Sequence, residues 1–372
     1  MTDFRILSSL ADIDSSYWDG LHGSNNPFVS HAFLHGLEST GCLRPEWGWT
    51  PCHPTLWDGD TLLAAAPGYL KGNSHGEFVF DQPWAEAYGR YGRRYYPKWL
   101  IGVPYTPVGG PRLLARDASH RHGLAEAMMG FANERGLSSI HVNFIDESET
   151  DGLPGDWLPR STVQFHWQNR GWRDFDAFQD SLQSKKRKNI RQERAKTAAA
   201  GYTFRTLHGT DIGDDDLCRM HAFYRSTFEH YGNAPALTLA FFQLLRARCP
   251  QSLVLVMASR TGETCAGALF LRNHDTLYGR YWGSSENSPG LHFETCYYQG
   301  IEYCLREGLQ RFEPGAQGEH KVARGFLPVM THSRHWLREQ EFIAALRSWC
   351  GNETRAMHNY AKAIGMAGPF RD

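Results

Sequence analysis

The sequence contains a weak internal repeat, and this feature restricts the possible fold more than any other. Four short segments of the first half recur in the same order in the second half. The matching pairs are 4–7 with 204–207, 30–37 with 238–245, 69–71 with 270–272, and 134–140 with 306–312. One such match would mean little, but four in register indicate that a supersecondary unit has been duplicated. We therefore expect two copies of one topology.

Each copy is predicted to be an α+β unit with the order strand, two helices, several strands, helix, strand. In both copies the last helix ends at a glycine, Gly136 or Gly308, the residue type that most often follows a helix C-terminus. Alternating apolar residues then predict a strand, as at 140–144. The expected ranges are 4–8, 14–22, 30–40, 54–58, 62–70, 99–114, 119–135 and 140–144 in the first copy, and 202–207, 214–231, 237–248, 252–259, 264–272, 276–283, 292–307 and 311–313 in the second.

The length of 372 residues agrees with two domains, since a domain usually has roughly 100–200 residues. Residues 150–174, which contain Gly, Pro and Trp, form the expected junction. We therefore expect an N-terminal domain over 1–165 and a C-terminal domain over 175–372. The first copy is the longer one because it carries an aromatic-rich insertion at 76–104.

The charge balance excludes a protein that binds nucleic acids or membranes through bulk charge, because 39 Lys and Arg face 40 Asp and Glu. The N-terminus lacks a signal-peptide pattern, and no run of about 20 apolar residues predicts an integral membrane segment. The eight cysteines never form C-x-x-C. We interpret them as reduced thiols of a cytoplasmic protein, and their spacing predicts no metal site.

The insertion at 76–104 combines eight aromatic residues with four basic ones. Two interpretations remain open. The insertion forms an aromatic sheet edge that packs between the two domains, or it forms part of a groove for a ring-bearing or anionic substrate. On the second interpretation, Trp84 and the nearby Tyr105 contact the substrate.

The basic run 185–196 is predicted to be a helix that buries little, because it has almost no apolar stripe. Its positive face either stays solvated or binds the phosphates of a nucleotide-linked or RNA-linked substrate. The candidate phosphate-binding residues are Lys185, Arg187, Lys188 and Arg191.

The segment 312–326 is the most informative part of the chain. Its three glycines and one proline predict a tight, non-repetitive backbone at a strand end, and functional residues often lie in such loops. A purely structural polar loop is the alternative. The candidate residues of this segment are Glu313, Gln317, Glu319, His320, Lys321 and Arg324.

A second polar cluster lies on the predicted strand 276–283 and in the first turn of the next helix. Strand alternation places Arg280 and Trp282 on one face and Tyr281 on the other. The helix dipole favours an acid in a first turn, so helix capping is an alternative role for Glu294. The expected substrate contacts of this cluster are Arg280, Tyr281, Trp282, His292 and Glu294.

These motifs resemble a known group of enzymes. Residues 181–191, Ser-Leu-Gln-Ser-Lys-Lys-Arg-Lys-Asn-Ile-Arg, resemble the start of the second domain of Fem-type acyltransferases, peptidoglycan-bridge enzymes built from two GNAT-like domains. Glu-Pro-Gly-Ala-Gln-Gly-Glu-His-Lys at 313–321 and Leu-Tyr-Gly-Arg-Tyr-Trp-Gly at 277–283 are similar to bacterial predicted N-acyltransferases related to peptidoglycan biosynthesis or recognition. The segments 26–31 and 80–84 resemble the same group.

The resemblance implies an α+β fold of two tandem GNAT-like domains, each a mixed, mostly antiparallel sheet flanked by helices. It implies an N-acyltransferase that moves an acyl or aminoacyl group from a thioester or an aminoacyl-tRNA to the amine of a small molecule, a peptide or a cell-wall precursor. Acyl-CoA or aminoacyl-tRNA would be a co-substrate, with no tightly bound cofactor, and the second donor would make tRNA a partner. The alternative from another class is a non-catalytic recognition module for a peptidoglycan-type or peptide ligand.

The sequence departs from the GNAT pattern at the acetyl-CoA loop, where residues 287–290 read Asn-Ser-Pro-Gly. This departure makes aminoacyl-tRNA the alternative donor. For amine transfer the site needs a proton acceptor, for which His320 is suited, while Glu319 would act directly or through a water molecule. Lys321 or Arg324 would stabilise the oxyanion or bind donor phosphates. Glu313 completes the expected catalytic group.

Overall fold

The computed structural model describes residues 2–22, 26–151, 153–316 and 318–371. The chain forms two compact units, 1–163 with 330–359, and 164–329 with 360–372. The boundaries fall inside strands β9 (Leu158–Gln168) and β15 (Leu327–Leu337) and inside helix α11 (Gln340–Met366). The structure thus assigns residues 330–359 to the first unit, whereas the sequence-based division placed all of 175–372 in one C-terminal domain.

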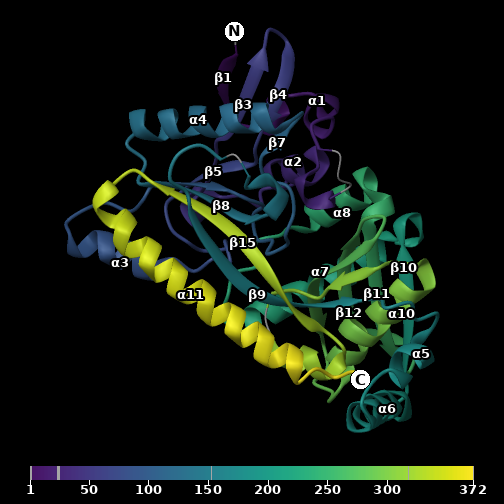
Figure 1. The fold of residues 1–372 in the computed structure, drawn as a ribbon. Helices are drawn as coiled ribbons and strands as arrows, with labels where there is room; N and C mark the ends of the chain where they lie inside the picture. The colour runs from purple at the N-terminus through teal and green to yellow at the C-terminus, as the bar shows by residue number, and fades with distance from the viewer. Residues whose placement is uncertain (1, 23–25, 152, 317, 372) are drawn as a thin grey trace. The chain divides into compact units, whose positions relative to one another are not determined.

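The first unit has two sheets (Figure 1). One has the strand order β1-β3-β4-β7 and is antiparallel. The other has the order β9-β15-β8-β6-β5-β2, in which β6 and β8 run parallel. The elements are β1 (Asp3–Leu7), α1 (Ser15–Asp19), α2 (His31–Ser39), β2 (Trp49–Pro51), β3 (His53–Asp58), β4 (Thr61–Ala65), β5 (Gly68–Lys71), α3 (Gln82–Arg90), β6 (Lys98–Ile101), β7 (Leu114–Ala115), α4 (Ala118–Glu134) and β8 (Ser139–Ile145).

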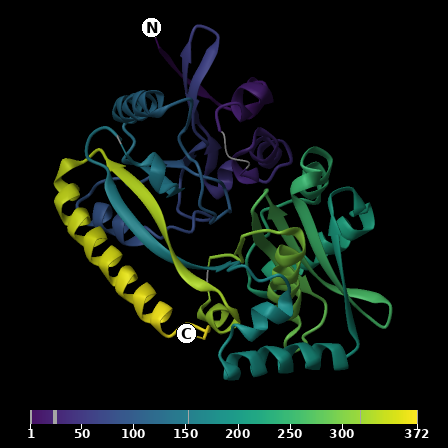
Figure 2. The ribbon, with the colours of Figure 1, turned by 45° about the vertical axis from the view of Figure 1, so that its right-hand side comes forward.

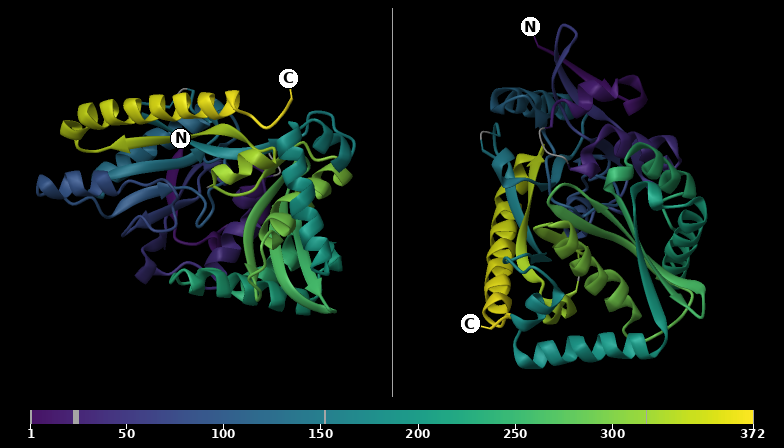
Figure 3. Two further views of the ribbon diagram at one scale, coloured as in Figure 1. Left: turned by 90° about the horizontal axis from the view of Figure 1, so that it is seen from below. Right: turned by 90° about the vertical axis from the view of Figure 1, so that its right-hand side faces the viewer.

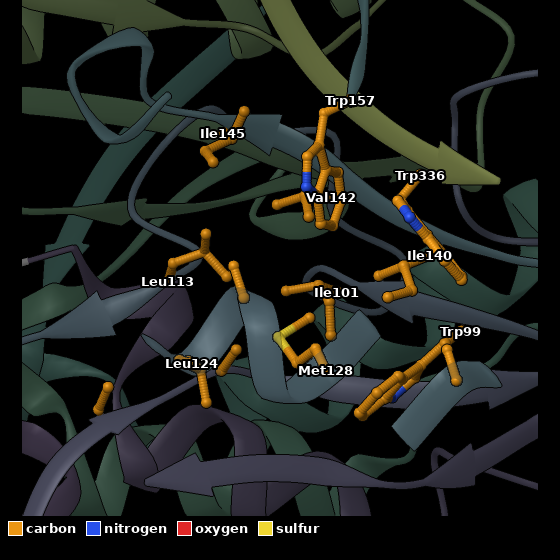
Figure 4. Close-up of a cluster of buried hydrophobic side chains, with 14 of the residues drawn as sticks. Trp99, Ile101, Leu113, Leu124, Met128, Ile140, Val142, Ile145, Trp157 and Trp336 are labelled. Atoms are coloured by element: carbon orange, nitrogen blue, oxygen red, sulfur yellow. The ribbon is translucent and has the colours of Figure 1, made fainter. Parts of the chain in front are cut away.

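The core of the first unit lies between α4 and the strands β6 and β8 (Figure 4). All seven residues of β8 are buried, as expected for a strand covered on both faces. Leu124 and Met128 of α4 pack with Ile101, Ile140 and Val142 in this cluster. The helix begins at the capping residue Asp117 and ends before Gly136, whose φ of 65° is the left-handed conformation that glycine adopts without strain.

The second unit repeats the element order of the first. Its sheet has the order β10-β11-β12-β13-β14-β9, with β13 and β14 parallel and the other pairs antiparallel. The elements are α5 (Phe175–Asp180), α6 (Ser184–Ala199), β10 (Tyr202–His208), α7 (Asp214–His230), α8 (Leu239–Arg248), β11 (Leu253–Arg260), β12 (Glu263–Arg272), β13 (Thr276–Ser284), α9 (Leu291–Phe293), the π-helix η7 (Glu294–Tyr298), α10 (Gln299–Glu307), β14 (Arg311–Glu313) and the 3-10 helix η8 (Glu319–Arg324).

The duplicated order predicted from the sequence is therefore present in both units. The parallel pair β6 and β8 of the first unit corresponds to β13 and β14 of the second, with α4 between the strands of the first pair and the consecutive helices α9, η7 and α10 between those of the second. The elements β2, α3 and β7 have no counterpart in the second unit, and a further difference lies in the strand that precedes this pair. β12 is one continuous strand, whereas the first unit uses β4 and β5, which belong to different sheets.

Each unit takes a strand from a distant part of the sequence. β15 lies beside β8 in the first unit, with α11 running along it (Figures 1 and 3), and β9 pairs with β14 in the second. The insertion at 76–104 supplies α3, and its aromatic residues Trp84, Tyr88 and Tyr95 form a buried cluster with Leu346 and other residues of α11. These aromatic side chains therefore stabilise the interior of the first unit.

None of the helices in the described ranges is both long and apolar enough to cross a membrane. Over the same ranges, no group of three or more His, Cys, Asp or Glu side chains is arranged to hold a metal ion. All eight cysteines are free thiols, and only Cys218 is exposed.

Candidate functional site

In the second unit the parallel strands β13 and β14 pair over only three residues and then separate. Their registered partners are residues 276–278 and 311–313. β13 continues to Ser284, while the chain after Glu313 turns away at Pro314. Gly279 stands where the strands part, and a Cβ atom there would lie 3.1 Å from the Cα of Pro314. Glycine therefore permits the close approach from which the two strands diverge.

A β-bulge on β13 lies next to this divergence. Leu269 of β12 is opposite Tyr281, and Phe270 is opposite Gly279, so Arg280 is the extra residue. A bulge bends its strand and redirects the neighbouring side chains. The simple alternation used in the sequence analysis therefore does not describe how Arg280, Tyr281 and Trp282 are oriented.

The divergence encloses a cavity of about 140 Å³. Its walls come from β12, β13, the turn of α9 and η7, and Pro314 at the end of β14. Four of the predicted substrate contacts line it together, and no sequence motif marked several of the other lining residues. The lining residues are Ala268, Leu269, Phe270, Gly279, Arg280, Tyr281, Trp282, His292, Cys296, Tyr297 and Pro314.

The π-helix η7 contributes Cys296 and Tyr297 to the cavity wall. π-Helical turns are rare and occur frequently at functional sites. The ring of Tyr297 lies 5.3 Å from that of His292, which lies 5.2 Å from the ring of Trp282. The apolar pattern of 292–307 predicts an ordinary helix here, because it does not distinguish a π-turn from an α-turn.

The segment after β14 brings His320 next to a residue of the cavity wall, since its Nε2 is 3.1 Å from the hydroxyl of Tyr297. Gly318 has a φ of 117°, and a Cβ atom there would lie 2.3 Å from Cε1 of His320. Lys321 donates from Nζ to the carbonyl oxygen of Gly315 at 2.7 Å. Glu319 accepts a hydrogen bond from Tyr360 of α11. Gln317 lies outside the described residues.

Burial and positive charge keep the histidines of the site neutral. Burial lowers the pKa of His292 to about 4, with smaller contributions from His320, Lys321 and Arg324. Burial also lowers the pKa of His320 below its usual value, helped by the two cations. Burial lowers the pKa of Lys321 to about 8. Near pH 7 the site thus offers a neutral imidazole as a proton acceptor and a mostly protonated lysine.

Glu313 ends β14, and its Oε1 lies 3.9 Å from Nδ1 of His166 on β9. Burial, followed by the charges of Lys321 and Arg311, lowers the pKa of His166 to about 3. His166 was not singled out from the sequence. No local pattern marks it, because it reaches Glu313 only through the pairing of β9 with β14.

Two residues predicted to bind substrate form ion pairs with residues of α6. Glu294 is 3% exposed and binds Arg194, with an Oε1 to Nη2 distance of 3.0 Å. Arg324 is 7% exposed and binds Glu193, with an Nη2 to Oε1 distance of 2.6 Å. The charged groups of Glu294 and Arg324 therefore hold α6 in place, and Glu294 also has the expected first-turn position, at the start of η7. The contacts of both residues with substrate stay predictions.

Trp84 and Tyr105 belong to the first unit. Trp84 is 1% exposed, packed against His141, His335 and Trp349. Tyr105 donates a hydrogen bond to the carbonyl oxygen of Cys42. Trp84 is therefore buried inside the first unit, which differs both from a substrate contact and from the expected packing between the two domains.

The basic run forms α6 on the outside of the second unit (Figures 2 and 3), and only Ile190 and Thr197 of it are buried. Two of its four candidate phosphate ligands, Arg187 and Arg191, lie 3.3 and 3.6 Å from a carboxylate oxygen of Asp180. Lys185 and Lys188 are exposed and have no ion pair within the described part of the chain. Among the four candidates, these two lysines are therefore the ones available to bind a phosphate.

The sequence as a whole matches the family model for FemAB-like proteins, described as peptidoglycan biosynthesis/recognition, over residues 9–372. The chain belongs to the FemAB-like family. No curated protein matches the sequence significantly. The family assignment predicted from the sequence motifs is thus confirmed, and the description of the family, peptidoglycan biosynthesis/recognition, agrees with the predicted class of substrate.

Solved structures also resemble this chain. A crystal structure of FemX has 11% identity and a TM-score of 0.52, and the match covers 90% of this chain and 98% of FemX. A tandem GNAT protein from the clavulanic acid biosynthesis pathway has 12% identity and a TM-score of 0.45, with 91% and 98% covered. L-PGS from Bacillus licheniformis has 10% identity and a TM-score of 0.48, with 86% and 95% covered. The predicted α+β fold of two tandem units is confirmed, and the likeness to the fold of FemX extends over nearly the whole chain.

Proposed function

We propose that the second unit of this FemAB-like protein transfers an aminoacyl group from an aminoacyl-tRNA to the amine of a peptidoglycan-type precursor. The observation that carries the proposal is the cavity between the diverging strands β13 and β14, with the Tyr297–His320 pair at its wall and Lys321 close behind. This arrangement supplies a pocket that is open on one side, with a proton acceptor and a cation held close to it.

In the proposed step the amine nitrogen forms a bond to the ester carbonyl carbon, and the bond from that carbon to the ribose oxygen breaks. His320 accepts the proton of the amine and returns it to the departing ribose oxygen. The ammonium group of Lys321 stabilises the negative charge that develops on the carbonyl oxygen. Holding the two reactants in one cavity contributes the remaining acceleration.

The preference for an ester donor over acyl-CoA rests on the segment between β13 and α9. A CoA pyrophosphate needs several convergent N–H donors. This segment instead contains Pro289, which has no N–H, and the carboxylate of Glu286, which is held by Tyr202 and Arg260. These residues do not fit the diphosphate group, so no step is assigned to CoA.

The test combines the purified protein with tRNA charged with labelled amino acids and with a UDP-linked muramyl pentapeptide. We expect amide-linked label on the peptide from charged tRNA, and none when acetyl-CoA is the only donor. Transfer from acetyl-CoA alone would overturn the choice of donor. Saturable binding of the pentapeptide with no turnover from any donor would make the protein a recognition module instead.

A matched pair of variants tests the assignment of the proton acceptor. His320→Asn keeps a polar side chain but cannot accept the proton, so we expect turnover to fall on the order of a hundredfold with unchanged thermal stability. Glu319→Gln tests the second expected proton acceptor, because its amide oxygen can still accept the hydrogen bond of Tyr360 but cannot accept a proton from the amine. If Glu319→Gln loses as much turnover as His320→Asn, the carboxylate takes part in proton transfer.

A further inference from the structure

Two consecutive residues of α6 connect this helix to both sides of the cavity. Arg194 contacts both carboxylate oxygens of Glu294 at 3.0–3.2 Å and Oε1 of Glu302 at 2.7 Å. Glu193 accepts two hydrogen bonds from Arg324, at 2.6 and 3.2 Å. We call these two residues, Glu193 and Arg194, the α6 clamp.

The partners of the clamp are the residues that frame the Tyr297–His320 pair. Glu294 begins the π-helix η7, which carries Tyr297 three residues later. Arg324 ends the 3-10 helix η8, and its Nη1 donates to the carbonyl oxygen of His320 at 2.7 Å. One half of the clamp therefore fixes the element that carries Tyr297, and the other half fixes the turn that carries His320.

Further contacts tie the two halves together. Tyr298 of η7 donates to the carboxylate of Glu193 and accepts from Nε of Arg324 at 3.1 Å. The guanidinium of Arg324 lies 3.5 Å from the ring centroid of Phe293, directly before η7. Since α6 buries only Ile190 and Thr197, its attachment depends on these charged contacts much more than on an apolar stripe.

We propose that Glu193 and Arg194 are positioning residues that hold Tyr297 and His320 at hydrogen-bonding distance, and so set the geometry of the cavity wall. The inference rests on the proposed function for its catalytic meaning, because only there does His320 accept a proton. Its structural content, the dependence of the Tyr297–His320 contact on α6, is independent of any substrate. Neither clamp residue touches the cavity itself, so each acts through another residue.

The first measurement needs no substrate. In the full-length protein, selectively labelled with ¹³C in histidine and tyrosine rings, we expect a nuclear Overhauser contact between Tyr297 and His320. Glu193→Gln removes the charge that holds Arg324, and we expect this contact to disappear while most other signals are unchanged. Glu193→Asp keeps the charge, and we expect it to restore the contact in part. It also serves as the working variant if Glu193→Gln does not fold.

The matched control is Glu229→Gln, which removes the carboxylate of an exposed ion pair with Arg225 on α7 of the same unit. The control should leave the contact intact. In the transfer assay, Glu193→Gln should lower kcat about tenfold with little change in KM for the acceptor. A Glu193→Gln protein that keeps both the ring contact and full kcat would overturn the inference. If the wild-type protein shows no transfer, the proposed function fails while the ring contact still tests the clamp.

Discussion

At the residue scale, Lys321 is the most unusual group of the site, because it is 2% exposed and has no ion pair within the described ranges. Burial without a counter-charge lowers its pKa to about 8. An ammonium in such surroundings is a stronger electrostatic partner for a developing oxyanion than one in water. The same burial makes its charge sensitive to mildly alkaline pH.

We therefore predict a bell-shaped pH profile for transfer. Activity should rise with pH through the pKa of His320, which lies below its usual value, because only the neutral imidazole accepts a proton. It should fall above about pH 8, as Lys321 loses its proton. Lys321→Arg keeps the charge, so its remaining activity should lack the alkaline fall. An unchanged alkaline limb in Lys321→Arg would exclude Lys321 as its origin.

A second residue-scale prediction concerns stability. The pKa of His292 is about 4 in the folded chain and near 6.5 when unfolded, so between these values the unfolded chain binds more protons. The folded chain is therefore most stable above about pH 6.5, where His292 is neutral in both states, and its free energy of unfolding falls as the pH falls toward 4. Between pH 7 and pH 5, the free energy of unfolding measured with urea should therefore fall by about 1–2 kcal/mol less in His292→Gln than in the wild type. If the free energy of unfolding depends on pH in the same way in both proteins, the assignment to His292 is wrong.

At the scale of elements, α6 has two differently engaged faces. Glu193 and Arg194 face the cavity elements, whereas Lys185 and Lys188 are exposed to solvent. The outer face can bind the phosphates of the proposed tRNA donor without disturbing the inner one. Binding of tRNA should accordingly weaken with salt, as phosphate contacts always do.

Lys185→Ala combined with Lys188→Ala should reduce the slope of log affinity against log salt concentration by roughly one to two units for tRNA. The matched control is Arg355→Ala with Lys362→Ala, which removes two exposed charges from α11. The measurement is filter binding at several salt concentrations. An affinity and slope equal to those of the wild type would show that the exposed face of α6 is only solvated.

Local patterns were sufficient to predict most elements. The glycine-terminated helices α4 and α10, the meander β11 to β13 and the basic helix α6 all lie close to their expected ranges. The partners of Glu294 and Arg324 could not be predicted, because Arg194 and Glu193 are 100 and 131 residues away in the sequence. The bulge at Arg280 and the π-turn at Tyr297 have no periodic signal, and both shape the cavity.

At the scale of the whole molecule, the first unit depends on residues from the end of the chain. β15 supplies Trp336 to the main core, and α11 supplies Phe342 and Leu346 to the cluster around Trp84. We predict that a fragment of residues 1–163 shows no cooperative thermal unfolding. Without these apolar side chains, the core residues that they cover are exposed to water. Co-expression with residues 327–372 should restore part of the transition. A cooperative, near-native melting curve of the fragment alone would contradict the assignment.

This dependence has a consequence for how the protein is made in the cell. A ribosome synthesises a chain from its N-terminus at about 5–20 residues per second. Roughly 10–35 s therefore pass between the synthesis of β8 and that of β15. During that interval the edge of β8 is available for pairing with other strands, including those of neighbouring nascent chains. Expression of this protein should therefore be sensitive to chaperones that shield unfinished sheets, and more so at high translation load.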